Sequence, residues 1–316
     1  MSAFFAHQPR DASMGILSKW MRWLIQAISP GLKAQFDVYM PHLKQRVGNY
    51  AFDRIDQVAL ARFVQSHTLS SPVERSFKNG LAVVIPCFNH ADYLEATVTC
   101  LLNQTYRPFQ VIFVEDHSTD ETWARLHYLT SNFPDNIKVT LQRNDRNRGQ
   151  SASINLGIEQ TRASLYTILN DDDYLAHDGL EAIVEILRDR SDLYLLGAGA
   201  RPFGGIIGPP IDAETWRIAH MYPEYTAIPL VEYTPSRVPT LVHANDLNMA
   251  HSGTTFFRGA WQAVGGYYTD RDARVVVFAD RDFQLRVAGL FPVSVSKVVP
   301  FSYWRDDSSV DTGKYS

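Results

Sequence analysis

The sequence predicts an α/β protein built on a doubly wound, mixed and mostly parallel sheet with helices on both faces. Three observations lead to this fold class. Short apolar runs alternate with helical patterns from residue 81 onward, the runs are apolar on both faces, and polar residues follow each run. Strands that are buried on both faces and alternate with helices are typical of sheets whose crossover connections cover both sides.

Four segments are predicted to be strands because each is a short apolar run rich in β-branched and aromatic residues. They are residues 81–86, 109–115, 137–142 and 164–169. Helices are predicted to begin near Asp92, Thr119, Gly149 and His177. Asp92 and Glu95 have the spacing of a capping box at the first helix, and the last helix carries an apolar stripe. The stripe consists of Leu180, Ile183, Val184 and Leu187.

Residues 1–78 are predicted to form a helical extension before a main domain that spans residues 79–316. Apolar residues recur at helical spacing within residues 14–29, which also contain Lys19 and Arg22. This stretch is too short to span a bilayer. Two interpretations are open: the helix packs on the main domain, or it lies on a membrane surface with its aromatic side chains among the headgroups.

The composition is that of an ordinary soluble globular protein, with 45% apolar and 20% charged residues among 316. A net charge of −4 argues against nucleic acid as a partner. Two cysteines, Cys87 and Cys100, are too few for a disulfide framework, and the first apolar stretch lacks a signal-peptide cleavage site. We therefore expect a cytoplasmic location, with peripheral contact to the inner face of the membrane through residues 14–29 as the open alternative.

Polar residues follow each predicted strand and read, in chain order, CFNH, DHSTD, NDRNRGQS and NDDD. In doubly wound sheets, ligands bind at the carboxyl ends of the strands. Acidic residues after two strands, with a turn rich in asparagine, arginine and glycine after another, suit a ligand with a polar ring, a hydroxylated middle and a phosphate end. The sequence therefore predicts a nucleotide site at this edge of the sheet.

Three aspartates, Asp171, Asp172 and Asp173, stand side by side where the last of these strands ends. Adjacent carboxylates repel one another, and burying them without compensation is costly. We therefore expect a metal ion or a cationic side chain beside them, unless water solvates the run. In that last case the run is a turn that caps the helix beginning near His177.

Two long segments resemble the nucleotide-sugar half of family 2 glycosyltransferases of the GT-A fold. They are VVIPCFNHADYLEATVTCLLNQTYRPFQVIFVEDHSTDET and NRGQSASINLGIEQTRASLYTILNDDDYL, within about residues 80–178. TTFFRGAWQAVGGY and ADRDFQLRVAG resemble the family's later, acceptor-side elements. The resemblance implies a nucleotide-sugar half at 79–178, followed by an acceptor half and C-terminal tail at 179–316.

The resemblance also implies an activity. A family 2 enzyme moves a sugar, with inversion, from a nucleotide-sugar donor to a hydroxyl of a glycan or lipid-linked acceptor, as in cell envelope polysaccharide biosynthesis. UDP is the donor nucleotide that the resemblance favours, while dTDP and GDP stay open.

A set of donor-binding residues follows from the same resemblance. Its members are Pro86, Phe88, Asn89, Asp116, Asn147, Gly149, Asn155, Asn170, Asp171 and Arg305. Asp116 would accept a hydrogen bond from a uracil-like ring, although DHSTDET also fits a helix N-cap formed by Ser118 or Thr119. Ile154 stands where the family often has arginine, and Arg148 is the candidate to replace that cation.

The aspartate run matches the family's metal motif, with Asn170 in place of its first acidic residue. The resemblance implies that Asp172 and Asp173 hold Mg²⁺ or Mn²⁺ together with the diphosphate oxygens of the donor. Carboxylates and phosphate oxygens are the ligands that these hard cations prefer. The expected positive charge beside the aspartates is then a metal ion that arrives with the substrate.

The catalytic base is implied to lie in FADRDFQLRVAG, where Asp280 is the first candidate and Asp282 the second. Ala279 stands where the family commonly has glutamate. Removal of a proton by a positioned carboxylate contributes about 10²–10⁴-fold to rate. In the competing structural interpretation, Asp280 caps a helix and Asp282 pairs with Arg286 at i+4.

Two further places carry open alternatives. His251 and Ser252 precede a strand-like run, where His251 is either a structural residue or a contact for the acceptor or a metal. In the tail segment YWRDDSSV, Arg305 matches an arginine that closes over the diphosphate in the family. An acidic residue, Asp306 or Asp307, stands where that tail often has a histidine.

Two rival functions fit parts of the sequence. A nucleotidyltransferase on the same fold would need a triphosphate loop rich in lysine or arginine after the first strand, and CFNHADY lacks one. A non-catalytic nucleotide-sugar-binding or scaffold protein of the same descent would explain Asn170, Ala279, Ile154 and the absent tail histidine.

Overall fold

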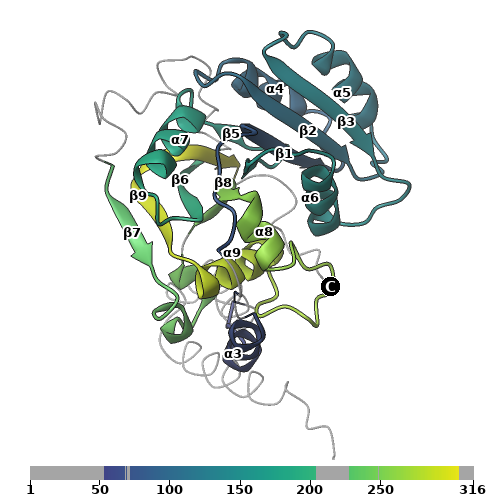
Figure 1. Ribbon diagram of the computed structural model, residues 1–316. Coiled ribbons are helices and arrows are strands. Elements are labelled where there is room, and N and C mark those ends of the chain that lie inside the picture. Colours follow the sequence, from purple (N-terminus) through teal and green to yellow (C-terminus); the bar gives the residue numbers. More distant parts are fainter. Residues whose placement is uncertain (1–52, 68, 70–71, 204–227, 248, 306–316) are drawn as a thin grey trace, which may run out of the picture. The chain divides into compact units, whose positions relative to one another are not determined.

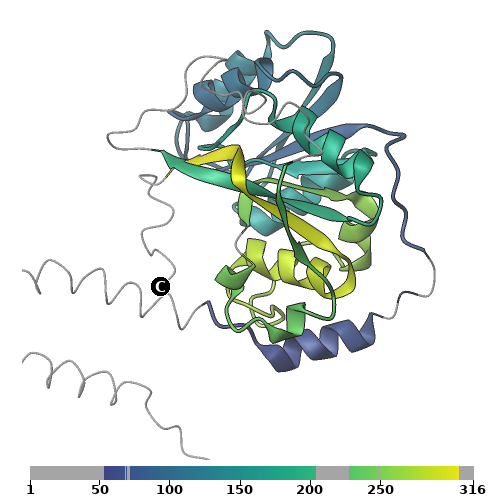
Figure 2. The same ribbon diagram turned by 90° about the vertical axis from the view of Figure 1, so that its left-hand side faces the viewer.

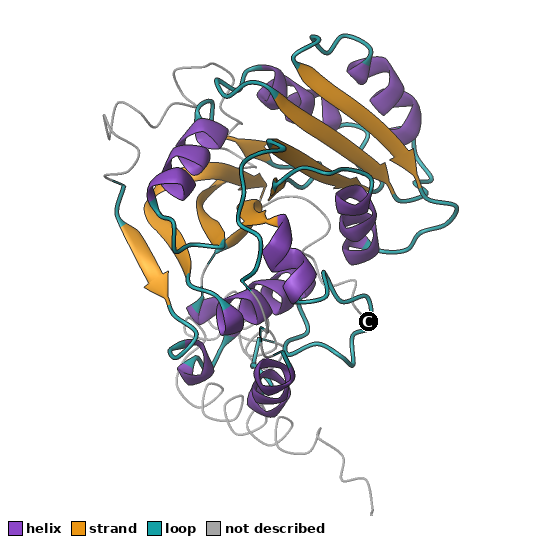
Figure 3. Cartoon of the chain, in the orientation of Figure 1, coloured by secondary structure: helices purple, strands orange, loops and turns teal. Residues whose placement is uncertain are grey.

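The computed structural model describes residues 53–305 apart from residues 68, 70, 71, 204–227 and 248. Nine strands of this part of the chain form one sheet in the order β3-β2-β1-β4-β8-β6-β9-β5, with β7 beside β9. Helices lie on both faces of the sheet (Figure 3). The predicted α/β class with a mixed sheet is therefore confirmed.

The first half of the sheet contains the four predicted strands, which are parallel to one another. They are β1 (Leu81–Cys87), β2 (Phe109–Glu115), β3 (Ile137–Arg143) and β4 (Leu165–Ile168). Helices follow the strands in the predicted order and begin within a few residues of their predicted starts. They are α4 (Leu94–Leu102), α5 (Thr122–Thr130), α6 (Gln150–Glu159) and α7 (Gly179–Asp189).

The capping box predicted at the start of α4 is wrong. The residue before the helix is Tyr93, and no side chain caps the first turn. Asp92 is exposed, and Glu95 forms an ion pair with Arg125 of α5 instead. The turn before α4 closes through its own backbone, since the N–H of Tyr93 donates to the carbonyl of His90 at 3.0 Å.

The second half of the sheet is mixed. It contains β5 (Tyr174–Leu175), β6 (Leu195–Phe203), β7 (Leu230–Tyr233), β8 (Ala250–Phe257) and β9 (Val293–Arg305). The remaining helices of the described chain that follow α7 are α8 (Arg258–Ala263), α9 (Ala279–Leu290) and two 3₁₀ turns, Val238–Thr240 and Ala244–Asp246. Because β8 runs antiparallel to β4, its first residues lie at the edge where β4 ends.

Two hydrophobic cores lie on opposite faces of the sheet, because alternate residues of a strand point to opposite sides. Leu81, Val83 and Ile85 of β1 belong to the core with α4, α5 and α7. Ala82 and Val84 belong to the core with α6 and α9. The apolar stripe predicted on α7 is buried in the first of these cores.

Helix α3 (Gln57–Ser66) joins the second core. The Asp56 carboxylate caps it by accepting from the N–H groups of Val58 and Ala59, and Leu60 and Phe63 are buried. Figure 2 shows α3 alongside the elements of the second half. The predicted boundary at residue 78 stays a prediction, and residues 14–29 lie outside the described residues.

None of the described helices has the length and apolar character needed to cross a lipid bilayer.

Helix α6 packs closely on the sheet at Gly157. A Cβ there would lie 2.6 Å from Cγ1 of Val84 and 3.1 Å from Cγ2 of Val114. Gly157→Val is therefore expected to lower the free energy of unfolding by about 1–3 kcal/mol, the usual cost of overpacking. Urea denaturation measures this loss. Glu159→Val places the same side chain at an exposed position of α6 and is the control. Equal losses for the two variants would contradict the close packing.

Candidate functional site

Hydrogen bonds tie together the loops that follow β1, β2 and β4 at one edge of the sheet; Figure 1 shows the labelled strands β1 and β2 side by side. The backbone N–H of Phe88 donates to Oδ2 of Asp171 at 3.1 Å, and that of Asn89 donates to Oγ of Ser118 at 3.0 Å. These bonds join the first loop to the other two. This is the edge at which the sequence predicts a ligand.

Asp116, directly after β2, organises the turn that leads into α6. Its buried carboxylate accepts from the Asn144 side chain at 2.6 Å and from the backbone N–H groups of Arg148 and Gly149 at 2.8 and 2.7 Å. Gly149 has φ +83°, a conformation that favours glycine. Asn147 contributes through its side-chain oxygen, which accepts from the same Gly149 N–H at 3.2 Å.

The loop after β1 is shaped by Asn89, which has φ +56°. Its side-chain oxygen accepts from the backbone N–H of Thr119 at 2.8 Å. The alternative in which Ser118 or Thr119 caps α5 is wrong, because Glu121 precedes that helix and the first-turn N–H of Thr122 donates to Asp120 at 3.0 Å. Both hydroxyl residues bind the neighbouring loop instead. Pro86 lies within β1, and the ring of Phe88 is 40% exposed at this edge.

A buried histidine, which the sequence analysis did not single out, lies against the aspartate run. Nδ1 of His90 is 2.8 Å from Oδ1 of Asp171. Burial raises the pKa of the Asp171 carboxyl, and the hydrogen bond from His90 opposes this only in part. Burial lowers the pKa of His90, but the hydrogen bond to Asp171 and the neighbouring carboxylates outweigh it and raise the pKa overall.

All three aspartates of the run are buried, with 4%, 7% and 4% of Asp171, Asp172 and Asp173 exposed. The alternative of a solvated turn is therefore wrong. His90, Asp171 and Asp172 each offer a ligand atom within 4.8 Å of the others. Two carboxylates and an imidazole form a donor set that suits a divalent cation. The sequence analysis paired Asp172 with Asp173 as the metal ligands, whereas the structure groups Asp172 with Asp171 and His90.

Asp173 points toward the first residues of β8. Its Oδ2 accepts from the hydroxyl of Ser252 and from the side-chain N–H of Asn170, the latter at 3.1 Å. Asn170 also accepts from Gln150 at the start of α6, at 3.0 Å. Asn170 and Asp173 therefore link the loop after β4 to α6 and to β8.

Asp280 lies in the first turn of α9 and is partly exposed. Phe278 precedes the helix and no side chain caps it, so the interpretation of Asp280 as a cap is wrong. The charge of Asp280 favours a higher pKa for both His251 and Tyr267, although burial is the larger cause in each case. Nε2 of His251 is 3.3 Å from the hydroxyl of Tyr267, so these two side chains form a pair.

Asp282 is fully buried and occupied by structural contacts. Its carboxylate accepts from the backbone N–H of Val275 at 2.8 Å and from Nε of Arg286 at 2.9 Å. The expected i,i+4 pair with Arg286 is confirmed. Of the two candidates for the catalytic base, only Asp280 is therefore partly exposed and without a hydrogen bond from the described residues.

Asn155, predicted to bind the donor, holds the turn after α8 instead. Its side chain donates to the carbonyl of Tyr267 at 2.7 Å, and its oxygen accepts from the Tyr267 N–H at 2.9 Å and from Nε1 of Trp261 at 3.0 Å. Ile154 is buried, and the Arg148 guanidinium pairs with Asp145. Arg305 ends β9, and its side chain lies outside what the structure describes.

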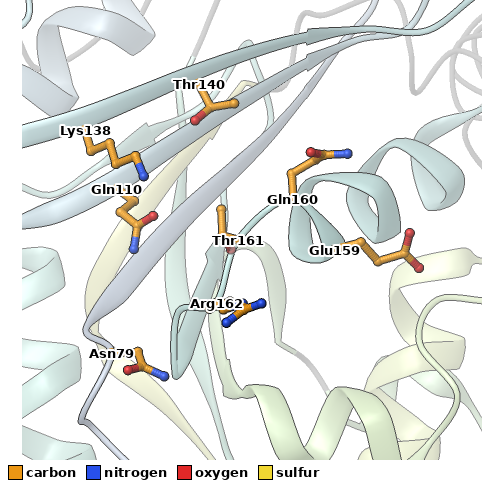
Figure 4. A pocket seen from close by; sticks show the side chains of 8 residues that line it. All are labelled: Asn79, Gln110, Lys138, Thr140, Glu159, Gln160, Thr161 and Arg162. Atoms are coloured by element: carbon orange, nitrogen blue, oxygen red, sulfur yellow. The ribbon is translucent and has the colours of Figure 1, made fainter.

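A polar pocket lies at the opposite ends of the strands (Figure 4). It is lined by Asn79, Gln110, Lys138, Thr140, Glu159, Gln160, Thr161 and Arg162. None of these residues belongs to the predicted site. The predicted nucleotide site, at the carboxyl ends of β1, β2 and β4, is therefore separate from this pocket.

His251 makes folding sensitive to acid. Burial lowers its pKa, and the Asp280 charge opposes this only in part. Below the unfolded value of about 6.5, the unfolded chain takes up a proton that the folded chain resists, so stability falls as the pH drops. The loss of unfolding free energy between pH 7 and pH 5, measured with urea, is expected to be smaller in His251→Gln than in wild type. An equal loss would contradict this assignment.

Comparison with known proteins finds a family model for part of the chain. Residues 82–223, which include the loops after β1, β2 and β4, match the model of glycosyl transferase family 2. The sheet of this chain is of the GT-A type. The structure of S. aureus TarS residues 1–349 in complex with UDP-GlcNAc is similar with a TM-score of 0.52 at 15% identity, covering 72% of this chain and 59% of that one. At this identity the likeness shows the fold alone.

Similar sequences come from bacteria. A GalNAc(5)-diNAcBac-PP-undecaprenol β-1,3-glucosyltransferase of Campylobacter jejuni is 30% identical over 105 residues, which cover 33% of each chain. An uncharacterized glycosyltransferase of Haemophilus influenzae is 29% identical over 101 residues, 32% of this chain and 39% of the relative. The matches thus span well under half the length of these relatives.

Proposed function

We propose that this chain is a glycosyltransferase that moves a sugar, with inversion, from a nucleotide-sugar donor to a hydroxyl of a glycan or lipid-linked acceptor. The observation that carries the proposal is the meeting of three features at one edge of the sheet. They are the Asp116 carboxylate, the N-terminus of α6, and the buried group of His90, Asp171 and Asp172. In that order they suit the base, the diphosphate and the metal of a nucleotide-sugar.

Asp116 supports recognition of a pyrimidine base. A carboxylate has about four acceptor sites, and Asp116 uses three of them on N–H groups of the described residues. The remaining site would accept the ring N–H of uracil. A site built to make this bond disfavours bases that lack the donor. Thymine and guanine carry a ring N–H as well, so dTDP and GDP are tested beside UDP, the nucleotide that the family resemblance favours.

Asp172 would hold Mg²⁺ or Mn²⁺ together with the diphosphate oxygens. Its buried carboxylate accepts no hydrogen bond from the residues that the structure describes, so it is available to a cation. When bound, the metal neutralises charge that develops on the leaving diphosphate. The free N–H groups of the first turn of α6 add donors for the same phosphates.

Asp280 would act as the general base. It would take the proton of the acceptor hydroxyl as that oxygen attacks the anomeric carbon from the side opposite the diphosphate, which inverts the configuration. The hydrogen bond between Asp173 and Ser252 holds the start of β8 against the loop that carries Asp172. It thereby supports a site in which the acceptor binds next to the donor. Membrane contact through residues 14–29 is a separate proposal about residues that lie outside the described ones.

Isothermal titration with UDP, dTDP and GDP, each with and without Mn²⁺, tests the donor site. We expect metal-dependent binding of one nucleotide that Asp172→Asn abolishes. Asp116→Asn is expected to weaken binding by about 10- to 100-fold, because a hydrogen bond to a charged group contributes about 1.5–3 kcal/mol. Asp145→Asn, which removes an exposed carboxylate of the turn between β3 and α6, is the control and should bind as wild type does.

Two results would change the proposal. Absence of binding by any nucleotide under either condition would contradict the donor site. Binding without any turnover of nucleotide-sugars, in wild type and in Asp280→Asn alike, would favour the non-catalytic binding protein.

A further inference from the structure

His90 lies inside the candidate metal group, although no pattern in the sequence links it to the aspartate run. Its side chain is 8% exposed, and Asp171 and Asp172 are as deeply buried. The three residues come from the loops after β1 and β4, which end side by side because these strands pair in parallel. The group is therefore built by the fold and not by a local motif.

The separation between His90 and Asp171 fits two ligands of one ion. Nδ1 of His90 is 2.8 Å from Oδ1 of Asp171. Neighbouring ligands of an octahedral cation with bonds of about 2.1 Å lie about 3 Å apart. An ion can therefore bind both atoms with only small shifts. The Nδ1 lone pair is available to it when the imidazole carries its proton on Nε2.

The net charge of His90, Asp171 and Asp172 also favours the binding of a cation. Asp173 is bound to Ser252 and Asn170, but Asp171 and Asp172 form no ion pair with any lysine or arginine of the described residues. Among the described residues, His90 contacts Asp171 and offers a ligand atom within 4.8 Å of those of both aspartates. Two buried carboxylates and one imidazole leave a net negative site, which a divalent cation neutralises.

We propose that His90 is a nitrogen ligand of the divalent cation, beside Asp172 and Asp171, and that the site therefore binds Mn²⁺ more tightly than Mg²⁺. The proposal rests on the donor site described above, whose metal it concerns. Imidazole nitrogen is a common ligand of transition metals, whereas Mg²⁺ is held almost entirely by oxygen. A site with one nitrogen ligand thus discriminates between the two ions.

Pulsed electron paramagnetic resonance of the full chain with Mn²⁺, alone and with UDP, tests the proposal directly. We expect modulation from a directly bound nitrogen that changes when the protein is made with ¹⁵N-labelled histidine. This measurement uses the wild-type protein, so it does not depend on the folding of any variant.

Titration of variants adds a second readout. His90→Gln is expected to abolish the nitrogen signal and to weaken Mn²⁺ binding by about 10- to 100-fold, while Mg²⁺ binding changes less. His127→Gln, which replaces an exposed histidine of α5, is the matched control and should keep both the signal and the affinity. A thermal melt of each variant checks that it is folded.

The outcomes separate this inference from the proposed function. If Mn²⁺ binds wild type with UDP but shows no histidine nitrogen, His90 only positions Asp171; the inference is then wrong and the donor site stands. If wild type binds neither UDP nor Mn²⁺, both are wrong. Equal affinities for Mn²⁺ and Mg²⁺ would also contradict the inference.

Discussion

Asp280→Asn is expected to lower the rate of sugar transfer by about 10²–10⁴-fold, the usual contribution of a general base, while nucleotide binding stays as in wild type. The carboxylate is partly exposed in the first turn of α9, and it accepts no hydrogen bond from the described residues. Its side chain is therefore available to an acceptor hydroxyl, unlike that of Asp282.

Release of nucleoside diphosphate from the donor identified by titration, in the presence of saccharide acceptors, measures this rate. Asp272→Asn, at an exposed position of the loop before α9, is the control and should turn over as wild type does. A wild-type rate in Asp280→Asn would place the base elsewhere.

Arg286→Met is expected to lower the free energy of unfolding by about 3–5 kcal/mol, because it leaves the Asp282 carboxylate buried without its partner. The guanidinium is fully buried, and it donates to Asp282, to the carbonyl of Val264 at 2.6 Å and to that of Gly266 at 2.8 Å. It also lies 3.6 Å from the centre of the Tyr268 ring. Folded domains are stable by only about 5–15 kcal/mol, so this loss is a large share of the total.

Chemical denaturation with urea measures the effect. The double variant Asp282→Leu/Arg286→Met is expected to recover part of the loss, since it removes the unpaired charge. Arg188→Met breaks an exposed pair with Glu185 on α7 and should cost at most about 1 kcal/mol. A loss of that small size in Arg286→Met would contradict the role of the buried pair.

The fold could be predicted from local patterns because its parallel strands are short apolar runs buried on both faces. The run at residues 109–115 has the same bounds in the sequence analysis and in the structure. The capping box expected at the start of α4 is absent, because Tyr93 and backbone hydrogen bonds form the first turn and no capping side chain marks it. A capping box is defined by only two residues, so the same spacing also occurs where no cap forms. A buried strand has a longer apolar run and is therefore easier to recognise.

The candidate site could be predicted only in part. Asp116 and Asp172 were predicted as site residues from the family motifs, and the structure places both in the loops that follow β2 and β4. His90 was missed because its partner Asp171 is far along the chain, and their contact depends on the pairing of β1 with β4. A search for a basic residue after the neighbouring strand would have found it.

Asn155 was predicted to bind the donor, but the structure gives its side chain another set of contacts. Its position matches a donor-binding pattern, but a helix carries side chains around its whole circumference. At this point of α6 the side chain faces the turn at Tyr267. Asp282 likewise has the right spacing but faces the core. The direction of a helical side chain depends on tertiary packing, which spacing alone does not give.

A crystal structure of the full chain with UDP and Mn²⁺ would locate the donor site. We expect a pyrimidine ring beside Asp116, the diphosphate at the N-terminus of α6, and the metal bound by Asp172 and phosphate oxygens. A nucleotide bound at another place, such as the polar pocket beside Lys138 and Arg162 at the opposite ends of the strands, would contradict this expectation.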